Sequence, residues 1–404
     1  MKTAGIVCEY NPFHIGHASH IESTRRILGG DAAVVCAISG NYVQRGDFAV
    51  FNKHARAKAA VLCGADLVVE IPSPYALTSA ERYAAAGVYI LDSLQICDYI
   101  SFGSESGDLK ALEEAAEAIV SERAGNIIKE WLDKGLSYAA AMQKTADAVM
   151  GARSELFLTP NNLLGIEYLK AIAALGSQLI PVTVKRGGAA HDSISGCSAS
   201  AIRKSLLNSG DPWAYIPPAA AGVFREELDG GRGPVSMRKC ELALLSRLRI
   251  MRGSSYSDLP DASEGLERRF AKYAASEATI DALLDKVKTK RYAMSRIRRM
   301  LMCACLGITG ADTIGPPPYI KVLAMNRNGM DLLKKAKKTA KTPIITKPAS
   351  ARKMSDRIGG MLEKEAAATD FYSLAYPAED SRIGGQEWRA GPVIIDHGVA
   401  DHSN

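Results

Sequence analysis

The stretch AGIVCEYNPFHIGHASH, residues 4–20, decides the fold of this chain. Its apolar start, Gly5–Cys8, predicts a short strand, and a polar turn then leads to a helix that begins around His14 and His17. A strand that ends at a helix N-terminus brings backbone N–H groups and the positive end of the helix dipole to one point, where phosphate binds well. Both histidines lie on one face of the first helical turn, and Gly16 leaves the backbone bare. The stretch therefore predicts a nucleotide site.

Strands and helices alternate through the first half of the chain. Apolar, β-branched runs predict strands at Gly5–Cys8, Ala33–Ile38, Leu67–Ile71, Asp98–Phe102 and Leu179–Val184. Helical spacing predicts helices at His17–Leu28, His54–Leu62, Ala80–Ser93, Leu109–Val120, Asn126–Trp131 and Asn162–Leu175. This alternation is typical of an α/β fold with a parallel, doubly wound sheet, in which ligands bind outside the C-terminal ends of the strands. Polar loops follow four of the five strands, so we expect the active site at that edge.

A glycine-rich stretch at residues 229–234 separates the two halves and predicts a linker. We therefore expect one domain at 1–229 and a second at 235–404. The second half reads as mainly α-helical, and the segment after Tyr376 has no clear period, so we expect that segment to be loosely ordered.

The charge of the chain is unevenly distributed. Residues 1–150 hold 13 Lys and Arg against 18 Asp and Glu, whereas the remainder holds 37 against 26. Two blocks without any acid, Lys286–Arg299 and Lys334–Lys353, lie in the basic half. A basic half suggests a polyanion partner, although a charge run is more often a solvated helix face.

The composition is that of an ordinary soluble globular protein, with 404 residues of which 47% are hydrophobic and 23% charged. No apolar run reaches the roughly 18 residues that span a bilayer, and the start lacks the order of a signal peptide. We therefore expect a cytoplasmic protein with no membrane partner. The eight cysteines include no Cys-x-x-Cys pair and are expected to be reduced, with no zinc site and no disulfide.

The histidine pair carries the strongest chemical signal. In adenylyl transfer, negative charge grows on the α-phosphate as pyrophosphate leaves, and imidazole N–H groups at a helix N-terminus can stabilise it without a covalent bond. Catalysis would then consist of positioning and electrostatics. The alternative is that His14 only caps the helix and His17 is a surface residue. The preceding strand, Asn11-Pro12 and Gly16 together favour the functional interpretation.

Several segments give the chain a close family resemblance. His14-Ile15-Gly16-His17 matches the signature of the HIGH nucleotidyltransferase superfamily, which includes class I aminoacyl-tRNA synthetases. More narrowly, most of residues 1–335 resembles the tRNA(Met) cytidine acetate ligase family, in order along the chain. The segments that carry this resemblance are Gly5 to His14, Ser39 to Gly46, Phe102 to Glu105, Pro160 to Asn162, Lys290 to Tyr292 with Arg296-Ile297, and Tyr319 to Leu323.

The resemblance implies a Rossmann-like nucleotidyltransferase domain followed by a mainly α-helical tRNA-binding domain. It also implies ATP, with magnesium, as cofactor, and acetate and elongator tRNA(Met) as substrates. Acetate and ATP would give acetyl-adenylate and pyrophosphate, and the acetyl group would pass to the wobble cytidine to form N4-acetylcytidine. Two other interpretations stay open. One is an enzyme that adenylates another acid, such as an aminoacyl-tRNA synthetase, and the other is a non-catalytic tRNA-binding protein that senses ATP.

The expected site residues follow from the motifs and the resemblance together. The expected catalytic residues are His14 and His17, and no residue is expected to ligate a metal. The expected ATP contacts are Val7, Cys8, Glu9, Tyr10, Asn11, Pro12, Phe13, Gly16, Gly103, Asn162 and Arg186, with Ser198, Ser200 and Arg203 as a second element that could hold the β- and γ-phosphates. Simpler alternatives are that Asn162 and Ser198 cap helices and that Arg186 is a basic side chain exposed to solvent.

Contacts with the tRNA backbone are expected from Lys290, Arg291, Arg296, Arg298 and Arg299. Tyr292 lies among them and could stack on a base, as aromatic residues do in single-strand recognition.

Three further features are interpreted as lying outside the site. Lys353–Arg357 resembles the Lys-Met-Ser-Lys-Ser loop of the synthetases, but it lies far beyond the predicted strands and is taken as a coincidence. His191-Asp192 could orient a proton acceptor for the incoming amine, and a loop pair outside the site is the favoured alternative. His20 and His54 are interpreted as surface residues.

Overall fold

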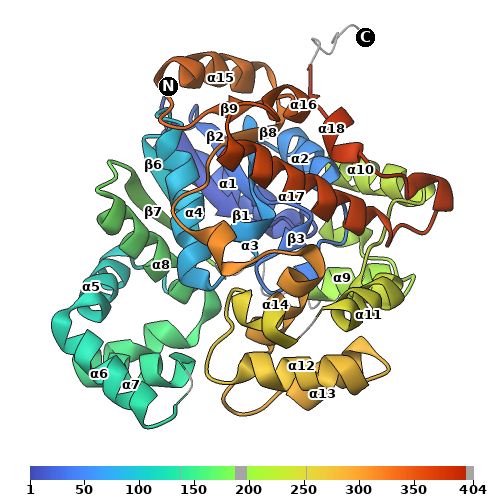
Figure 1. Cartoon of the computed structure of the whole chain (residues 1–404). Coiled ribbons are helices and arrows are strands. Elements are labelled where there is room, and N and C mark those ends of the chain that lie inside the picture. The colour runs from blue at the N-terminus through green and yellow to red at the C-terminus, as the bar shows by residue number, and fades with distance from the viewer. Residues whose placement is uncertain (137, 187–197, 252, 397–404) are drawn as a thin grey trace, which may run out of the picture.

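The parallel sheet predicted from the sequence lies at the centre of the molecule (Figure 1). The structure is a computed structural model that describes residues 1–136, 138–186, 198–251 and 253–396. Strands β5, β2, β1, β6 and β7 lie side by side in that order and are all parallel. The strands of the sheet are β1 (Thr3–Cys8), β2 (Ala33–Ser39), β5 (Leu67–Ile71), β6 (Tyr99–Ser104), β7 (Ile180–Lys185), β8 (Ile320–Met325), β9 (Ile344–Ile345) and β10 (Val393–Ile394). All five predicted strands are confirmed, and their order places the crossover beside β1, where such sheets bind ligands.

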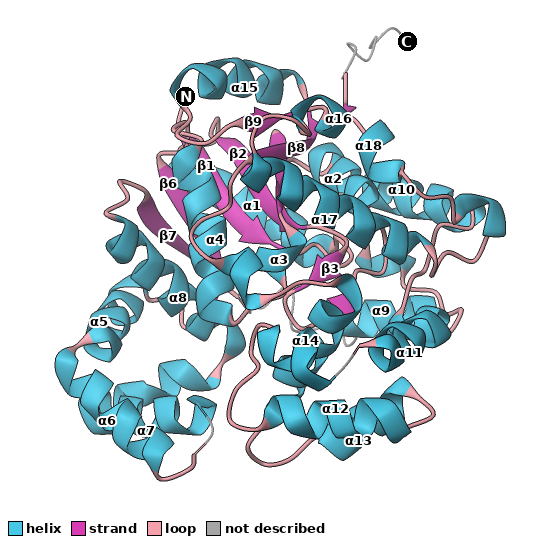
Figure 2. Cartoon of the chain, in the orientation of Figure 1, coloured by secondary structure: helices cyan, strands magenta, loops and turns pink. Residues whose placement is uncertain are grey.

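Helices cover both faces of the sheet (Figure 2). Successive side chains of a strand point to opposite faces, so Val7 and Val35 pack in one apolar cluster and Ile6 and Ile38 in another. The first cluster includes residues of α4 and α8, and the second includes residues of α2 and α10. The covering helices are α1 (Ile15–Leu28), α2 (Lys53–Leu62), α4 (Ala80–Ser93), α8 (Pro160–Leu175) and α10 (Pro218–Asp229). The helices predicted in this half are confirmed to within a few residues.

The second half of the chain also contributes strands to the sheet. β8 pairs antiparallel with β5, and β9 and β10 each pair in parallel with β8. Every residue of β8 is buried. No strand is predicted there from the sequence, because Lys321 interrupts the apolar run of β8 and the other two strands have two residues each. The division into 1–229 and 235–404 stays a prediction, and the sheet takes strands from both sides of it.

Most of the second half is helical, as predicted. α11 to α14 share a core that includes Leu244, Phe270, Leu283 and Ile297, and they lie below the sheet in Figure 1. The remaining helices are α3 (Ser73–Ala76), α5 (Leu109–Val120), α6 (Glu122–Asp133), α7 (Tyr138–Met150), α9 (Ala199–Leu207), α11 (Glu241–Ile250), α12 (Leu266–Ser276), α13 (Ile280–Val287), α14 (Met294–Leu306), α15 (Arg327–Thr339), α16 (Pro348–Ala351), α17 (Asp356–Ser373) and α18 (Gln386–Arg389).

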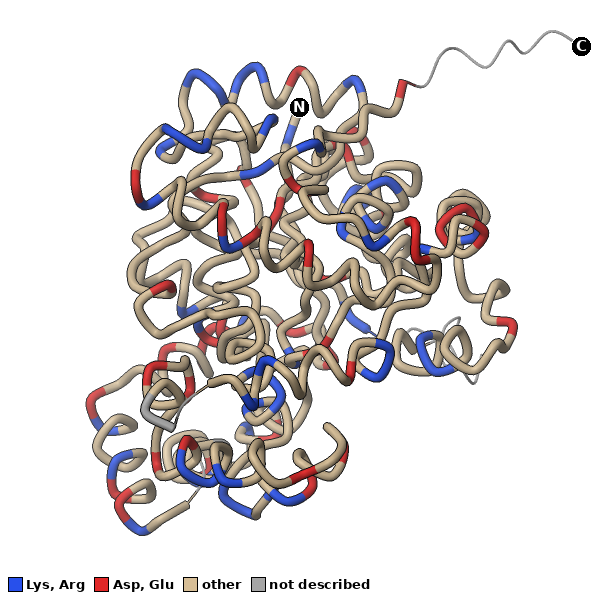
Figure 3. Tube along the Cα trace, turned by 45° about the vertical axis from the view of Figure 1, so that its right-hand side comes forward, with Lys and Arg blue, Asp and Glu red and all other residues tan. Residues whose placement is uncertain are grey.

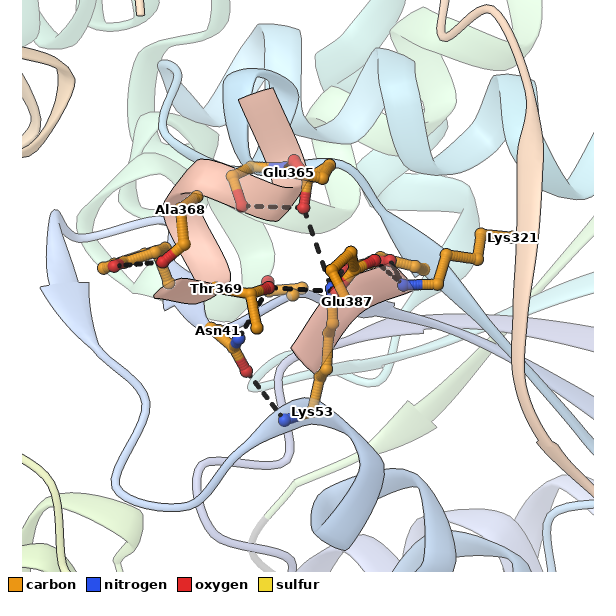
Figure 4. Close-up of polar contacts among 12 residues, drawn as sticks. Asn41, Lys53, Lys321, Glu365, Ala368, Thr369 and Glu387 are labelled. Carbon is orange, nitrogen blue, oxygen red and sulfur yellow. Dashed lines mark hydrogen bonds and ion pairs between the residues drawn. The ribbon is translucent and has the colours of Figure 1, made fainter. Parts of the chain in front are cut away.

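The segment after Tyr376 is ordered as far as residue 396, so the expectation of loose order is wrong for this part. Glu387 of α18 is only 1% exposed. Its carboxylate enters a group of five buried charged residues, which we call the buried charge cluster (Figure 4). The members of the buried charge cluster are Lys53, Glu70, Lys321, Glu365 and Glu387.

The buried charge cluster joins the two halves of the chain. Lys53 Nζ lies 2.6 Å from Glu70 Oε1 and 2.8 Å from Glu387 Oε2. Lys321 Nζ lies 3.0 Å from Glu70 Oε2 and also contacts Glu387. Because these side chains come from α2, β5, β8 and α18, the ion pairs fasten the C-terminal segment to the sheet.

Within the described residues, no helix combines the length and the apolarity required to cross a bilayer. The seven described cysteines are free thiols, and four of them are buried. Cys197 lies outside the described residues.

Candidate active site

The strand–helix turn, residues 9–17, carries both predicted catalytic histidines. His14 is the N-cap of α1, and its Nδ1 accepts a hydrogen bond from the Gly16 N–H at 3.0 Å. The N–H of His14 donates to His17 Nδ1 at 3.3 Å, which completes a capping box made by two histidines. The two ring centroids are 3.9 Å apart. Capping is therefore part of the geometry, and it holds both imidazoles together at the positive end of α1.

The capping bonds also determine which ring nitrogen of each histidine carries the proton. Nδ1 accepts a backbone hydrogen bond in both rings, so a neutral imidazole at His14 or His17 carries its proton on Nε2. Burial lowers the pKa of His17 well below its ordinary value, and His14, Arg186 and His20 act in the same direction. His17 is therefore neutral at physiological pH and has an Nε2–H donor.

His20 lies one turn further along α1. Its Nε2 is 3.0 Å from Ser101 Oγ of β6. Burial lowers the pKa of His20 to about 4, and Arg186 adds to the shift. The interpretation of His20 as a surface residue is wrong, because the ring packs between α1 and β6. His54 is also half-buried, and burial lowers its pKa to about 4, so the same interpretation is wrong there.

Gly103 and Arg186 meet where β6 and β7 end. The Arg186 N–H donates to Ser104 O at 2.7 Å, and a Cβ at Gly103 would lie 3.0 Å from Arg186 Cγ. The glycine thus leaves room for the arginine side chain along the end of β6. Because Arg186 lowers the pKa values of His17 and His20, its positive charge lies within electrostatic reach of both histidines.

Asn162 is buried at the start of α8, where Glu105 occupies the helix N-terminus. Asn161 Nδ2 donates to Glu105 Oε1 at 2.6 Å, and the Asn162 N–H donates to Glu105 Oε2 at 2.8 Å. The Asn162 side chain accepts a hydrogen bond from the Ser106 N–H at 3.1 Å. Partial burial would raise the pKa of Glu105, but the hydrogen bonds from the asparagines hold it below its ordinary value. Asn162 therefore fixes the loop after β6, and its contact with ATP stays a prediction.

Helix α9 brings Arg203 back to the strand–helix turn. Arg203 Nη1 donates to Asn11 O at 2.6 Å. Burial lowers the pKa of Arg203, while the carboxylates of Glu9 and Asp47 favour its charged form. The predicted second element thus lies beside the first at Arg203.

The two serines of that element lie at the start of α9. Ser198 caps the helix by accepting a hydrogen bond from the Ala201 N–H at 3.1 Å, as the simpler alternative proposed. Ser198 and Ser200 are both exposed. Their contact with phosphate stays a prediction.

Several of the expected ATP contacts before His14 have buried side chains. The side chains of Val7, Tyr10 and Phe13 are buried in the apolar clusters of the sheet. The Tyr10 ring centroid lies 4.8 Å from that of His17, and the Tyr10 hydroxyl lies 3.4 Å from Cys36 Sγ. These side chains therefore shape the turn and support His17, and contact of the turn with ATP stays a prediction.

Arg56 is a residue of the site that sequence reasoning missed. It is fully buried in α2. Its Nη1 donates to Glu9 O at 2.5 Å, and its Nη2 donates to Ser39 O at 3.0 Å and to Gly40 O. The guanidinium ties the ends of β1 and β2 together at the edge where the site lies. The only sequence signal was an arginine inside an alanine-rich helix.

The whole architecture is similar to that of known enzymes. Residues 1–387 match the family model HIGH Nucleotidyl Transferase. The tRNA(Met) cytidine acetate ligase of Acetivibrio thermocellus is 38% identical over 98% of this chain and 100% of the relative. The chain belongs to the tRNA(Met) cytidine acetate ligase family. A second relative of that name, from Caldicellulosiruptor saccharolyticus, is 37% identical over 98% of this chain and 99% of its own length.

A solved structure from the same family has the same fold. The crystal structure of Thermotoga maritima TmcAL bound with alpha-thio ATP aligns with a TM-score of 0.90 at 30% identity, over 98% of this chain and 100% of that chain. Membership of the tRNA(Met) cytidine acetate ligase family confirms the predicted fold class and the ligase class. The roles of single residues stay predictions.

The expected RNA contacts of this tRNA(Met) cytidine acetate ligase family member differ in their exposure. Arg296 Nη1 lies 2.6 Å from Glu264 Oε2, and Arg299 Nη2 lies 2.8 Å from Asp261 Oδ2. Arg299 is only 7% exposed, so the structure does not present it to RNA. Base stacking by Tyr292 is also contradicted, because Tyr292 is buried and its hydroxyl donates to Glu264 O at 2.7 Å.

Three of the expected RNA contacts remain accessible. Lys290 and Arg291 are exposed just before α14, and Arg291 Nη2 lies 3.7 Å from Glu264 Oε1. The side chain of Arg298 is 40% exposed, and its Nη1 lies 3.6 Å from Asp47 Oδ2. Arg298 lies where α14 contacts β4 (Asp47–Phe48).

The second basic block lies on another side of the molecule. β8 runs opposite to β5, so α15, which follows β8, begins at the edge of the sheet away from the strand–helix turn. Figure 3 shows Lys and Arg along this helix at the top of the molecule. The two basic blocks therefore do not form one continuous surface around the candidate site.

The remaining sequence features have structural roles or lie outside the described residues. Ser355, in the segment Lys353–Arg357, caps α17 by accepting a hydrogen bond from the Ile358 N–H at 3.3 Å. Arg357 Nη2 donates to Pro316 O at 2.6 Å. These contacts agree with the interpretation of that segment as a coincidence. His191-Asp192 lies outside the described residues.

Proposed function

We propose that this chain is an ATP-dependent acetate ligase that forms N4-acetylcytidine at the wobble position of elongator tRNA(Met). The observation that carries the proposal is the strand–helix turn, in which two histidines with Nδ1 engaged by the backbone lie together at the N-terminus of α1. Similarity to tRNA(Met) cytidine acetate ligases along nearly the whole chain supports the same substrate.

The first step would be the adenylation of acetate. An acetate oxygen attacks the α-phosphorus of ATP, the bond to pyrophosphate breaks, and acetyl-adenylate forms. Negative charge grows on the α-phosphate oxygens, and Nε2–H donors of His14 and His17 would stabilise it. Arg186 and Arg203, which flank the turn, would bind the other phosphates.

The second step would transfer the acetyl group to tRNA. The N4 amine of the cytidine attacks the acetyl carbonyl carbon, loses a proton, and AMP leaves. Lys290, Arg291 and Arg298 would bind the RNA backbone next to the site, which positions the anticodon without reading its sequence.

ATP would carry magnesium on its phosphate oxygens. Among the residues that the structure describes, no group of three or more His, Cys, Asp or Glu side chains could hold a metal ion. None of the steps above depends on a magnesium ion held by the protein alone.

Mass spectrometry of tRNA(Met) after incubation with ATP, acetate and the protein tests the proposal. We expect the wobble cytidine to gain one acetyl group, and we expect no product when acetyl-CoA replaces both ATP and acetate. Acetate-dependent exchange of labelled pyrophosphate into ATP tests the adenylate separately. Exchange with an amino acid but not with acetate would contradict the proposal and favour an aminoacyl-tRNA synthetase.

A further inference from the structure

The β3–β4 hairpin consists of residues 42–48, with β3 at Tyr42–Val43 and β4 at Asp47–Phe48. On one side it is bound to the strand–helix turn. The Gln44 N–H donates to Glu9 Oε1 at 2.8 Å, and Glu9 is the first residue of the turn. The hairpin is therefore held directly to the segment that leads to the two histidines.

On its other side the hairpin packs into the core of the helical part. Tyr42 and Phe48 are buried in the same apolar cluster as Ile297 and Met300 of α14. The Phe48 ring stacks on that of Tyr372 in α17, with centroids 5.8 Å apart. The hairpin thus has one end in the nucleotide site and its apolar side chains in the helical core, and Figure 1 shows β3 beside α14.

Gly46 makes the closest approach to α14. Its φ of +75° is one that side-chain-bearing residues rarely adopt. A Cβ at this position would overlap the backbone of Arg298 and Arg299. Helix α14 can occupy its place against the hairpin only because residue 46 has no side chain.

Asp47, the next residue, pairs with an arginine of α14 and lies within electrostatic reach of Arg203 in α9. Its Oδ2 is 3.6 Å from Arg298 Nη1 of α14. Burial raises the pKa of Asp47, while Arg298 and Arg203 favour its charged form. Arg203 is the residue of α9 that donates to Asn11 O in the strand–helix turn. One carboxylate therefore interacts with a guanidinium of the nucleotide site and with a guanidinium on the RNA side.

We propose that the β3–β4 hairpin positions α14, and with it the bound tRNA, relative to the strand–helix turn, and that Gly46 and Asp47 are positioning residues for acetyl transfer. This inference rests on the proposed function, because it concerns the second step of that reaction. Neither residue touches the reacting atoms. A shift of α14 would move the cytidine amine away from the acetyl-adenylate, and a misplacement of about 1 Å can cost about 100-fold in rate. The adenylation step needs no tRNA, so it would change far less than the transfer step.

Two variants test this role, each with a matched control. Gly46→Ala places a Cβ against α14, whereas Gly135→Ala introduces similar backbone strain at φ +82° with nothing within 4 Å. Asp47→Asn removes the charge that pairs with Arg298. Asp281→Asn removes an exposed carboxylate of α13 that lies 2.8 Å from Arg238 and makes no contact with the hairpin among the ion pairs described. Asp47→Glu keeps the charge and is the rescue variant.

The readouts are the rate of acetyl transfer in a single turnover, the KM for tRNA, and acetate-dependent pyrophosphate exchange. We expect Gly46→Ala to lower the transfer rate about 100-fold and Asp47→Asn about tenfold, with both other quantities changed less than about twofold. Asp47→Glu and both controls should transfer at close to the unaltered rate.

Several outcomes would overturn the positioning role. One is unaltered transfer in Asp47→Asn, and another is a parallel loss of transfer and exchange, which indicates a general structural defect. Asp47→Asn keeps the test decisive if Gly46→Ala does not fold. Failure of the unaltered protein to acetylate tRNA contradicts the proposed function itself, and the positioning role is rejected with it.

Discussion

The strand–helix turn and the buried charge cluster both contain cationic side chains, but they differ in what neutralises that positive charge. In the cluster, Lys53 and Lys321 are each within 3.0 Å of carboxylates, and all five side chains are closed to solvent. At the turn, Arg203 bonds to a backbone carbonyl, and Arg186 is exposed. The cluster neutralises its charges internally, whereas the turn presents positive charge and N–H groups that an anion can neutralise.

The cluster reaches a balanced charge through one shifted carboxyl group. Burial raises the pKa of Glu365 to about 8, with Glu70 adding to the rise, although Lys53 opposes it. Burial disfavours the charged form of Glu387 as well, but Lys53 and Lys321 outweigh it and lower that pKa. At neutral pH two lysines therefore face two ionised glutamates and one protonated glutamic acid.

The largest expected effect comes from removing a cation from the cluster. Lys53→Met leaves buried carboxylates without compensation, so we expect the free energy of unfolding to fall by about 3–5 kcal/mol. Lys58→Met is the matched control on the same helix, because Lys58 pairs with the exposed Glu226 at 2.9 Å. The control should change stability by less than about 1 kcal/mol. Denaturant unfolding measures both, and equal losses would contradict the structural role of the cluster.

A similar substitution in the strand–helix turn should affect catalysis and leave stability nearly unchanged. Asn can replace His14 as an N-cap but has no imidazole. Asn at position 17 likewise removes the imidazole of His17. We expect His14→Asn and His17→Asn each to lower kcat by about 10²–10³. Acetylation assays and unfolding curves of the same preparations test this. A variant with full activity would remove that histidine from the mechanism.

The third effect is a pH dependence of stability. The pKa of Glu365 is raised from 4.5 to about 8 on folding, so the folded state binds more protons than the unfolded state between these values. Stability contributed by this group therefore falls as pH rises from about 4.5 to about 8. Glu365→Gln should flatten the pH profile of the denaturant midpoint over this range. Glu363→Gln, on the same helix and exposed, should keep the profile of the unaltered protein.

The smallest expected effect concerns RNA binding by the exposed basic side chains just before α14. Lys290→Ala and Arg291→Ala should each reduce the slope of log affinity against log salt by about 0.7–0.9. Lys335→Ala, on α15 at the opposite edge of the sheet, should leave the slope unchanged. Filter binding of tRNA(Met) at several salt concentrations measures all three. A reduced slope for Lys335→Ala would extend the RNA surface to that side.

The fold was predictable where its signals are local. The parallel strands of the first half are β-branched runs with helices between them, and β1, β2 and β5 follow that pattern closely. The strands β8, β9 and β10 were not predictable, because two have only two residues and all depend on pairing with distant partners. The order of residues 377–396 depends on Glu387, whose cationic partners are far away in the sequence.

The site divides in the same way. His14, His17 and Arg203 were identified from contiguous motifs, and the structure brings them together around one turn. The roles of Arg56 and Asp47 depend on loops and helices that meet only in the folded chain. Arg299 was wrongly expected to contact RNA for a related reason. Its partner Asp261 lies outside the acid-free block, so the block alone does not reveal the pairing.

The position of the cluster's members along the sequence has a consequence for biosynthesis. Glu70 leaves the ribosome well before its partner Lys321 and the segment with Glu387 are synthesised. At about 5–20 residues per second, the interval is on the order of tens of seconds. During this time β5 lacks its antiparallel neighbour β8 and carries a carboxylate without its cationic partner from that strand. The nascent nucleotide-binding half therefore cannot complete its sheet until β8 has been synthesised, and protein quality control would meet it in an unfinished state until then.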